Sequence, residues 1–397
     1  MVKLKVLFIA NNNIGFGLSG GDTIFLKLLS HWKKQCSLTL LACQEAINIL
    51  PKNSVSAKII ITDSVNPNPH NSISNLFLHY LRRIFKVFTT IHRHQDLNNH
   101  HVVYSVSDFL PDLLPAVYLK IHNPHIKWIA GYYLFAPPPW SKSSPYHGIR
   151  YFKGFVYWLI QKFTLPLVNR YADLVLITSA PDRSRFLPSK SVFVIQGGVD
   201  LPVIKKYLQT HPLPPVSHRK FDACFLGRFH PQKGVLELID IWKIVTSTQP
   251  NAKLAIIGKG ELEKQMHLKI LKLKLSQNIT LLGFRDGNSK YDIFRQSKIV
   301  VHPATYDSGG MAAAEAMAFG LPGISFDLES LKTYYPQGMI KTPCFDLKLF
   351  ARNILNLLTD QNLYQKTSYQ ANNLILSKWS WEKKSTEILS TISTLSS

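Results

Sequence analysis

Short apolar runs alternate with segments of helical periodicity along most of the chain. Runs that are rich in β-branched residues and bounded by glycine, proline or polar residues are typical of buried parallel strands. The segments between them repeat apolar residues every three or four positions, which predicts helices. The pattern therefore predicts an α/β fold with doubly wound sheets. The expected strands are 5–10, 38–43, 58–62, 101–105, 126–133, 172–179, 192–195, 221–228, 253–258, 279–284, 299–303 and a run after Pro322, and the expected helices include 23–32, 110–119, 235–245, 261–275, 291–296, 311–318, 347–358 and 363–375.

The segment 299–326 reads as strand, loop, helix and strand. Alanine, methionine and glutamate give residues 311–318 one of the strongest helix propensities in the chain. Gly320 stands where the residue after the helix is expected, and Pro322 prevents the helix from continuing. The segment therefore predicts a complete strand–loop–helix–strand unit.

Two carboxylates flank the loop of this unit. Asp307 precedes Gly309 and Gly310, and Glu315 follows about two turns into the helix. Glycines let a ligand approach the backbone closely, and the free N–H groups of the helix start suit an anion or the hydroxyls of a polar ligand. A Rossmann-like unit with a purely structural helix and a solvated Asp307 would show the same residues.

A second strand–loop–helix unit begins near Phe221. Its loop carries Arg228 at the end of the strand and Lys233 before the helix 235–245. Arginine offers a planar fork and lysine a point charge, which together suit a diphosphate. The alternative is two surface cations without a common ligand.

The first strand leads into a glycine-rich loop over residues 11–22, before the helix 23–32. Strand, glycine loop and helix form the usual opening of a doubly wound domain, with a helix start suited to anions. The loop contains Gly20 and Gly21 but does not spell the dinucleotide fingerprint. By itself it is weak support for a nucleotide site.

Length and composition describe a globular protein of two domains. The chain has 397 residues, of which 46% are hydrophobic and 18% charged. The four cysteines are far apart and lack the spacing of a metal site, which indicates a reduced, cytoplasmic compartment and no structural zinc. The first apolar run is too short for a signal peptide, and no apolar stretch approaches the ~20 residues that span a bilayer.

The formal net charge is +22, and two spans of the first half contain no acidic residue. Residues 76–88 and 151–163 lie in these spans and interleave basic side chains with aromatic and aliphatic ones at helical spacing. Basic amphipathic helices suit the surface of an anionic membrane, here the inner face. Two ordinary core helices whose basic ends reach water are the alternative. We find no nucleic-acid-binding motif.

The acid–seven residues–acid spacing of Asp307 and Glu315, with glycines between and Gly-Leu-Pro after the helix, resembles the signature of retaining glycosyltransferases of the GT-B fold. The spacing of Arg228 and Lys233 resembles the phosphate clamp of that family, glycosyl transferases group 1. The resemblance is close over about 221–385 and loose before it. It implies two Rossmann-like domains facing across a cleft.

The resemblance also implies roles for individual residues. Asp307 and the amides of Gly309, Gly310 and Met311 would face the donor sugar, and Glu315 would hold the ribose hydroxyls. The catalytic set would be Asp307, Arg228 and Lys233, with the two cations stabilising the leaving diphosphate and no metal or other cofactor required. The strand ending at Gly283 would meet the base, and Gly20 and Gly21 would lie against the phosphates and the acceptor.

The chain departs from the family pattern at three places. Asp307 stands where the family has glutamate, and Gly197 stands where an Asn-Gly-Val-Asp element has asparagine, although Gly198 and Asp200 match. The family commonly places a histidine after the strand 126–133, where this chain has Gly-Tyr-Tyr. No catalytic histidine can therefore be named on the acceptor side.

These observations predict an acceptor-side domain at 1–200, a linker at 201–220, a nucleotide-sugar-binding domain at 221–379 and a helix at 380–397 that returns to the first domain. The expected activity is a retaining, metal-independent transfer of a hexose-type sugar from a nucleotide diphosphate sugar to an acceptor hydroxyl. Polysaccharide, glycolipid or cell-envelope glycan assembly is the expected setting, with a glycan or lipid-linked acceptor. A non-hydrolysing sugar-nucleotide epimerase and a catalytically inactive binding subunit remain alternatives.

Overall fold

The computed structural model of the protein describes residues 3–12, 19–50, 56–63, 73–141, 144, 146, 148, 150–307 and 309–396. The chain divides into two compact units. Unit 1 comprises 1–141, 146–195 and 382–397, and unit 2 comprises 142–145 and 196–381. Loop residues 13–18 and Ser308, both within predicted ligand loops, lie outside the described residues.

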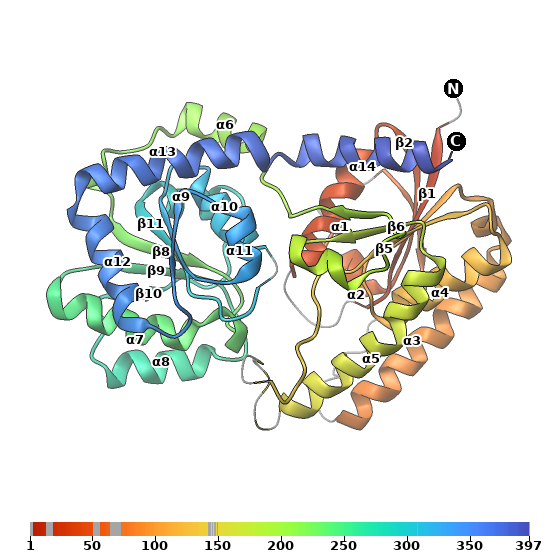
Figure 1. Ribbon diagram of the computed structural model, residues 1–397, viewed down its shortest axis with the longest axis horizontal. Helices are drawn as coiled ribbons and strands as arrows, with labels where there is room; N and C mark the ends of the chain where they lie inside the picture. Colours follow the sequence, from red (N-terminus) through yellow and green to blue (C-terminus); the bar gives the residue numbers. More distant parts are fainter. Residues whose placement is uncertain are drawn as a thin grey trace. The chain divides into compact units, whose positions relative to one another are not determined.

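Unit 1 is built on a parallel sheet. Its described strands run in the order β3-β2-β1-β4-β5-β6-β7, and every neighbouring pair is parallel. The elements are β1 (Leu4–Ala10), α1 (Gly20–Trp32), β2 (Cys36–Ala42), α2 (Gln44–Asn48), β3 (Lys58–Ile61), α3 (Ile73–Arg93), η1 (Gln95–Asn99), β4 (Val102–Ser105), α4 (Leu110–His122), β5 (Lys127–Gly131), α5 (Arg150–Tyr171), β6 (Leu174–Ile177), η2 (Ala180–Arg185) and β7 (Val192–Val194), with α14 (Trp381–Ser396) at the end of the chain (Figure 1).

The two faces of this sheet follow the alternation of side chains along its strands. Leu7 of β1 and Val103 of β4 belong to a core cluster with residues of α3, α4 and α5. Phe8, one position along, points to the other face, where its ring lies 5.9 Å from Phe25 and 5.7 Å from Trp32 of α1. Helices therefore cover both faces, as a doubly wound sheet requires.

Unit 2 repeats this architecture. Its described strands run in the order β10-β9-β8-β11-β12-β13, again with every pair parallel. Helices α7, α8 and α12 supply one core cluster with the inward residues of the sheet. The elements are α6 (Leu201–Thr210), η3 (Val216–His218), β8 (Phe221–Leu226), η4 (Pro231–Lys233), α7 (Val235–Thr248), β9 (Leu254–Ile257), α8 (Glu263–Lys272), β10 (Ile279–Leu281), α9 (Asn288–Arg295), β11 (Ser297–His302), α10 (Met311–Met317), β12 (Gly323–Phe326), α11 (Glu329–Tyr334), β13 (Met339–Thr342), α12 (Leu347–Thr359) and α13 (Gln361–Lys378). The predicted α/β class and the two Rossmann-like sheets are confirmed.

The N-terminal glycine loop is shorter than expected. Helix α1 begins at Gly20 rather than at Thr23, so Gly20 and Gly21 lie in its first turn. Ser19 caps the helix: its Oγ accepts from Asp22 N at 3.1 Å, and Asp22 Oδ2 accepts from Ser19 N at 2.7 Å. This reciprocal capping box satisfies two backbone donors and sets the helix start.

The segment 201–220 also differs from the expected linker. It belongs to unit 2 and contains α6, on which Ile204 and Tyr207 are buried. Pro202 lies in the first turn of α6, where a missing N–H leaves no helical hydrogen bond unmade. Proline therefore marks a helix start here. At the other end of the chain, all residues of α14 except Trp381 belong to unit 1. A hydrogen bond from Trp32 Nε1 of α1 to Ser385 O of α14, at 3.1 Å, joins the two helices.

Candidate active site

The predicted donor residues of unit 2 gather at the carboxyl ends of β8 and β11. These strands are neighbours in the sheet, and β8 marks the point where the strand order reverses. Loops that follow two such strands leave in opposite directions and open a crevice between them, which is the usual ligand position in this fold. The loop after β8 carries Arg228 and Lys233, and the loop after β11 carries Asp307, Gly309 and Gly310.

Backbone contacts hold the two loops against each other. Gln232 O accepts from Thr305 N at 2.9 Å and from Tyr306 N at 3.3 Å. Gly234 adopts φ 63°, and a Cβ at this position would lie 1.8 Å from Pro303 O. Only glycine therefore permits both the left-handed turn and the close approach. This contact explains why Lys233, next to Gly234, reaches the loop after β11.

The carboxylate of Asp307 is the centre of the cluster. Its Oδ1 accepts from the amides of Gly309 at 3.1 Å and Gly310 at 3.0 Å. Its Oδ2 accepts a hydrogen bond from Lys233 Nζ and lies 3.1 Å from His302 Nε2. Both oxygens are thus occupied by groups of the chain itself. In this structure the two loop amides face Asp307, where the sequence predicted that they would face a sugar.

The charge of Asp307 is stabilised although its side chain is only 9% exposed. Burial by itself would raise the pKa of this carboxyl, but the neighbouring Lys233 and the hydrogen bond from His302 hold it well below its usual value. Asp307 is therefore an anion over the whole physiological pH range. A fixed anion at this point orients the Lys233 ammonium at the crevice.

Helix α11 fixes the other side of the same loop. Ser330 Oγ donates to Asp307 O at 2.6 Å, and Tyr335 OH donates to Gly310 O at 2.8 Å. The ring of Tyr335 stacks on Trp379 at a centroid distance of 5.2 Å. The loop geometry is thus set by side chains that follow it in the sequence.

Glu315, the fifth residue of α10, forms an ion pair with a buried lysine of α9. Lys290 Nζ lies 2.9 Å from Glu315 Oε2, 3.1 Å from Glu315 Oε1 and 3.2 Å from Asp286 Oδ1. Burial would lower the pKa of Lys290, but Glu315 and Asp286 raise it above its usual value. Lys290 therefore keeps its charge and holds the Glu315 carboxylate in one place.

The start of α10 also contacts the segment that resembles Asn-Gly-Val-Asp. Gly197 adopts φ 94°, and a Cβ there would lie 2.3 Å from Cγ of Met311. Any larger residue, including the asparagine usual in the family, would displace the Met311 side chain unless both rearranged. Gly197 and Met311 therefore form one packed unit beside the loop.

Two other predicted residues of unit 2 lie near strand ends without joining the Asp307 cluster. Arg228 is exposed, and among the described residues no ion pair is formed by its side chain. Gly283 follows β10 with φ 68°, and its O accepts from Gly258 N at 3.0 Å. A Cβ on Gly283 would lie 3.7 Å from Cε of Lys259.

Gly20 and Gly21 belong to unit 1. A Cβ on Gly21 would lie 3.1 Å from the ring of Tyr133. Tyr133 is buried and its hydroxyl is hydrogen-bonded to that of Tyr104. Tyr133, one of the two tyrosines in the segment where the family has histidine, is therefore packed against the helix start that was predicted to meet the donor.

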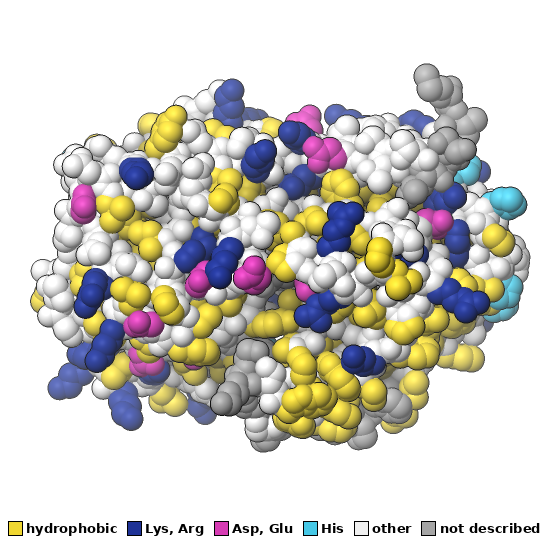
Figure 2. Space-filling view, in the orientation of Figure 1, with side chains coloured by type: hydrophobic (Ala, Val, Ile, Leu, Met, Phe, Trp, Pro, Cys, Tyr) yellow, Lys and Arg dark blue, Asp and Glu magenta, His cyan; other side chains and the backbone are white. Residues whose placement is uncertain are grey.

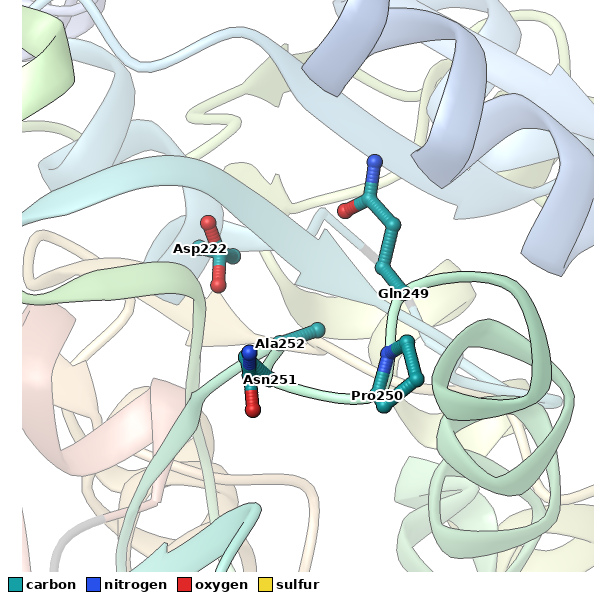
Figure 3. A pocket seen from close by; sticks show the side chains of 5 residues that line it. All are labelled: Asp222, Gln249, Pro250, Asn251 and Ala252. Carbon is teal, nitrogen blue, oxygen red and sulfur yellow. The ribbon is translucent and has the colours of Figure 1, made fainter.

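A separate hollow lies at the amino ends of the unit 2 strands, opposite the carboxyl ends that carry the Asp307 cluster. Figure 3 shows it between Asp222, near the start of β8, and residues 249–252, which follow α7. Asp222 accepts from Lys298 Nζ at 2.7 Å and from Lys253 N at 2.8 Å. Its carboxylate thus links β8 to β11, through Lys298, and to Lys253, the residue directly before β9. The hollow lacks the convergent groups of the Asp307 cluster.

Sequence reasoning missed His302 and Lys290 as site residues. His302 is the last residue of β11, which lies beside β8 at the strand-order reversal. Doubly wound folds bind ligands at this point, so His302 could have been chosen from its position at the end of a predicted strand. Lys290 gave no such signal, because its burial against Glu315 arises only when α9 and α10 pack.

Comparisons with known proteins bear on the second unit and on the fold. Residues 213–374 match the family model described as glycosyl transferases group 1. An uncharacterized glycosyltransferase of Methanocaldococcus jannaschii is 28% identical over 260 residues, which cover 63% of this chain and 60% of that protein. The poly(glycerol-phosphate) alpha-glucosyltransferase of Bacillus subtilis is 26% identical over 168 residues, which cover 40% of this chain and 24% of that protein.

The chain thus spans less than two thirds of these curated relatives. Among solved structures, Anabaena HepE in complex with UDP and glucose superposes with a TM-score of 0.72 at 16% identity, over 98% of this chain and 99% of that one. That likeness concerns the fold, which is GT-B. Within the second unit, residues 213–374 of this chain are thus similar to the group 1 glycosyl transferases.

Proposed function

We propose that the protein is a retaining, metal-independent glycosyltransferase that moves a sugar from a nucleotide diphosphate sugar to an acceptor hydroxyl. The observation that carries the proposal is the cluster of Lys233, Asp307 and the loop of Gly309 and Gly310 at the strand-order reversal of unit 2. The family match over 213–374 and the sugar-transferring relatives support the same class.

Lys233 and Arg228 would stabilise the diphosphate as it leaves. Negative charge grows on that group in the transition state, so cations fixed in advance lower the barrier more than they strengthen substrate binding. Asp307 would hold the Lys233 ammonium in place through Oδ2. With these two cations for the diphosphate, the reaction would proceed without a divalent metal.

Glu315 would accept hydrogen bonds from the ribose hydroxyls of the donor, positioned by Lys290. An ionised acceptor forms stronger hydrogen bonds than a neutral one. The base would lie near Gly283, at the end of β10. HepE was solved with UDP and glucose, and a uridine nucleotide is accordingly the first donor to test.

For the acceptor we propose a glycan or a lipid-linked glycan in polysaccharide, glycolipid or envelope assembly. The relatives' names include a transferase acting on poly(glycerol-phosphate) and an amylovoran biosynthesis glycosyltransferase. Unit 1 offers α3 and α5 for contact with a membrane that carries such an acceptor.

Donor turnover across a panel of nucleotide sugars, with and without glycan acceptors, tests the proposal. A transferase releases nucleotide and forms a glycoside with retained anomeric configuration, readable by NMR, and a chelator leaves the rate unchanged. An epimerase would convert the donor without an acceptor. An inactive subunit would bind nucleotide in calorimetry and release no product with any pair.

A further inference from the structure

Helices α3 and α5 of unit 1 flank α4 on one side of the sheet. Val87 of α3, Val117 of α4 and Val168 of α5 belong to the same core cluster. At the start of α4, Leu110 N donates to Tyr80 OH of α3 at 2.9 Å, and Phe109 stacks on Tyr157 of α5 at 5.0 Å. Each outer helix therefore has one side committed to the core and one side free to face outward.

The outward side of α5 is apolar. Phe152, Val156, Leu159 and Phe163 recur at intervals of four, three and four residues, which places them in one stripe along the helix. All four are exposed, Leu159 by 52% and Phe163 by 56%. A stripe at this spacing normally faces a core, but here no described residue covers it.

Helix α3 presents a second stripe. Leu78, Leu81 and Phe85 recur at intervals of three and four residues and are exposed, Phe85 by 67%. Figure 2 shows hydrophobic side chains gathered over the part of unit 1 where Figure 1 places α5. The packing thus excludes, for these residues, the alternative that both helices are ordinary core helices.

The charges that the two helices place beside the stripes are positive. Lys86 neighbours the α3 stripe, and Lys153 and Lys162 neighbour the α5 stripe. Arg82 of α3 is paired with Asp63 at 3.1 Å and is left out of this set. Neither helix contains an acidic residue. A second copy of this chain would be a poor partner, because a two-fold interface on this surface would bring cations against cations.

Two tryptophans stand beside the α5 stripe. Trp140 is 63% exposed, and its ring lies 5.1 Å from that of Trp158, whose ring centroid lies 5.3 Å from Lys162 Nζ. Tryptophan and lysine favour the boundary between acyl chains and headgroups, since each has an apolar part and a polar end. Among the described helices, none is both long enough and apolar enough to cross a bilayer.

We propose that the outward faces of α3 and α5 form a docking surface for a lipid bilayer with anionic headgroups. The two apolar stripes would enter the headgroup and upper acyl region with the helices parallel to the membrane, and Lys86, Lys153 and Lys162 would contact the headgroups. A membrane supplies both the apolar layer and the negative charge that this surface lacks.

Co-sedimentation of the full chain with vesicles tests the surface. Vesicles of phosphatidylcholine are compared with vesicles that also contain phosphatidylglycerol, at low and high salt. We expect binding to the anionic vesicles at low salt and weaker binding at high salt, because salt screens exposed charges. Equal binding to both compositions, or binding to neither, overturns the proposal.

Two double variants separate the apolar and the charged contributions. Lys153→Gln with Lys162→Gln should weaken binding to anionic vesicles on the order of tenfold at low salt, and by much less at high salt. Leu159→Gln with Phe163→Gln should weaken it about tenfold or more at both salt concentrations, since apolar burial is lost.

The matched control is Leu268→Gln with Leu271→Gln on α8 of unit 2, where both leucines are similarly exposed, at 59% and 64%. The control should bind vesicles like the unchanged protein, and an equal loss would contradict the assignment of the surface. Sedimentation velocity without vesicles tests the alternative occupant of this surface, a second copy of the chain. A dimer that the α5 double variant abolishes would overturn the proposal in favour of that second copy.

This inference does not depend on the proposed reaction. Nucleoside diphosphate binding, measured by calorimetry without vesicles, should be the same in all three double variants and serves as a check of folding. Failure to bind vesicles with intact nucleotide binding rejects the membrane surface alone, whereas vesicle binding without nucleotide binding rejects the transferase alone.

Discussion

His302 and Asp307 are joined side chain to side chain at the end of β11, with His302 Nε2 3.1 Å from Asp307 Oδ2. The histidine side chain is 3% exposed, so this contact is shielded from solvent. It turns the predicted sugar-binding carboxylate into the centre of a network that also includes Lys233. Each group in such a network depends on the others for its charge and position.

Removal of Lys233 should therefore destabilise the fold as well as affect the reaction. Lys233→Met leaves a buried anion without its cation, and we expect unfolding free energy to fall by about 3 kcal/mol. The double variant Lys233→Met, Asp307→Asn should cost ~1–3 kcal/mol less than the sum of the single variants. Urea denaturation of all four proteins gives the cycle, and additive costs would mean that the pair contributes nothing.

The diphosphate clamp predicts a different pattern for Arg228. Arg228→Ala should lower turnover on the order of 10²–10³-fold, with a smaller effect on donor binding. Arg228→Lys should recover part of the rate, because the charge returns without the fork. Since Arg228 is exposed, neither change should alter thermal stability, and Lys272→Ala on the exposed side of α8 is the control. Unchanged turnover of Arg228→Ala at saturating donor would remove this residue from the reaction.

Glu315→Gln should weaken nucleoside diphosphate binding by roughly 1.5–3 kcal/mol, because the ribose loses a charged acceptor. Isothermal calorimetry measures the change. Glu329→Gln in α11 of the same unit is the matched control and should bind normally, as its side chain is 71% exposed and pairs with Lys332 at the surface. Equal affinities of the two variants would exclude Glu315 from the nucleotide site.

Gly234 and Gly320 provide a pair that tests the contact between the two loops. Both have positive φ, 63° and 77°, but a Cβ on Gly320 meets only Ser368 Oγ at 3.5 Å, an ordinary van der Waals distance, whereas one on Gly234 meets Pro303 O at 1.8 Å. Gly320→Ala should cost about 1–2 kcal/mol from backbone conformation alone. Gly234→Ala should cost an additional ~1–3 kcal/mol through displaced backbone. Denaturant titration of both variants would refute the contact if the two costs were the same.

A buried carboxyl in unit 1 predicts how stability depends on pH. Burial raises the pKa of Asp108 to about 7, against ~3.9 in the unfolded chain. Between these values the folded protein binds the extra proton, so this group makes stability fall as pH rises from about 4 to about 7, and the loss is complete above that range.

Asp108→Asn should remove this dependence, because an amide does not titrate. The slope of unfolding free energy against pH over that window should become less negative by up to about 1.4 kcal/mol per pH unit. The amide oxygen can still accept from Gln161 Nε2, which lies 2.7 Å from Asp108 Oδ2. An unchanged slope would mean that Asp108 does not titrate in this window.

The sequence determined the order of elements and most of the candidate donor site. Strand and helix periodicity, the glycines at strand ends and the spacing of Arg228, Lys233, Asp307 and Glu315 are local properties, and local pattern suffices where each strand is buried on both faces. The helices expected at 76–88 and 151–163 could be predicted for the same reason, because their periodicity and lack of acidic residues are also local properties. Helix α1 began earlier than expected because Ser19 and Asp22 form a capping box, a local signal that the glycines obscured.

Only the tertiary structure decided which of these groups touch. Lys233 and Asp307 are far apart in sequence and meet because β8 and β11 are neighbours and Gly234 lets their loops approach. Lys290 becomes the partner of Glu315 only when α9 packs beside α10. The outward direction of Leu159 and Phe163 likewise follows from α4 and the sheet occupying the other side of α5. Which side chains meet, and which helix faces stay exposed, depends on how the elements pack against one another. No single segment of the sequence contains that information.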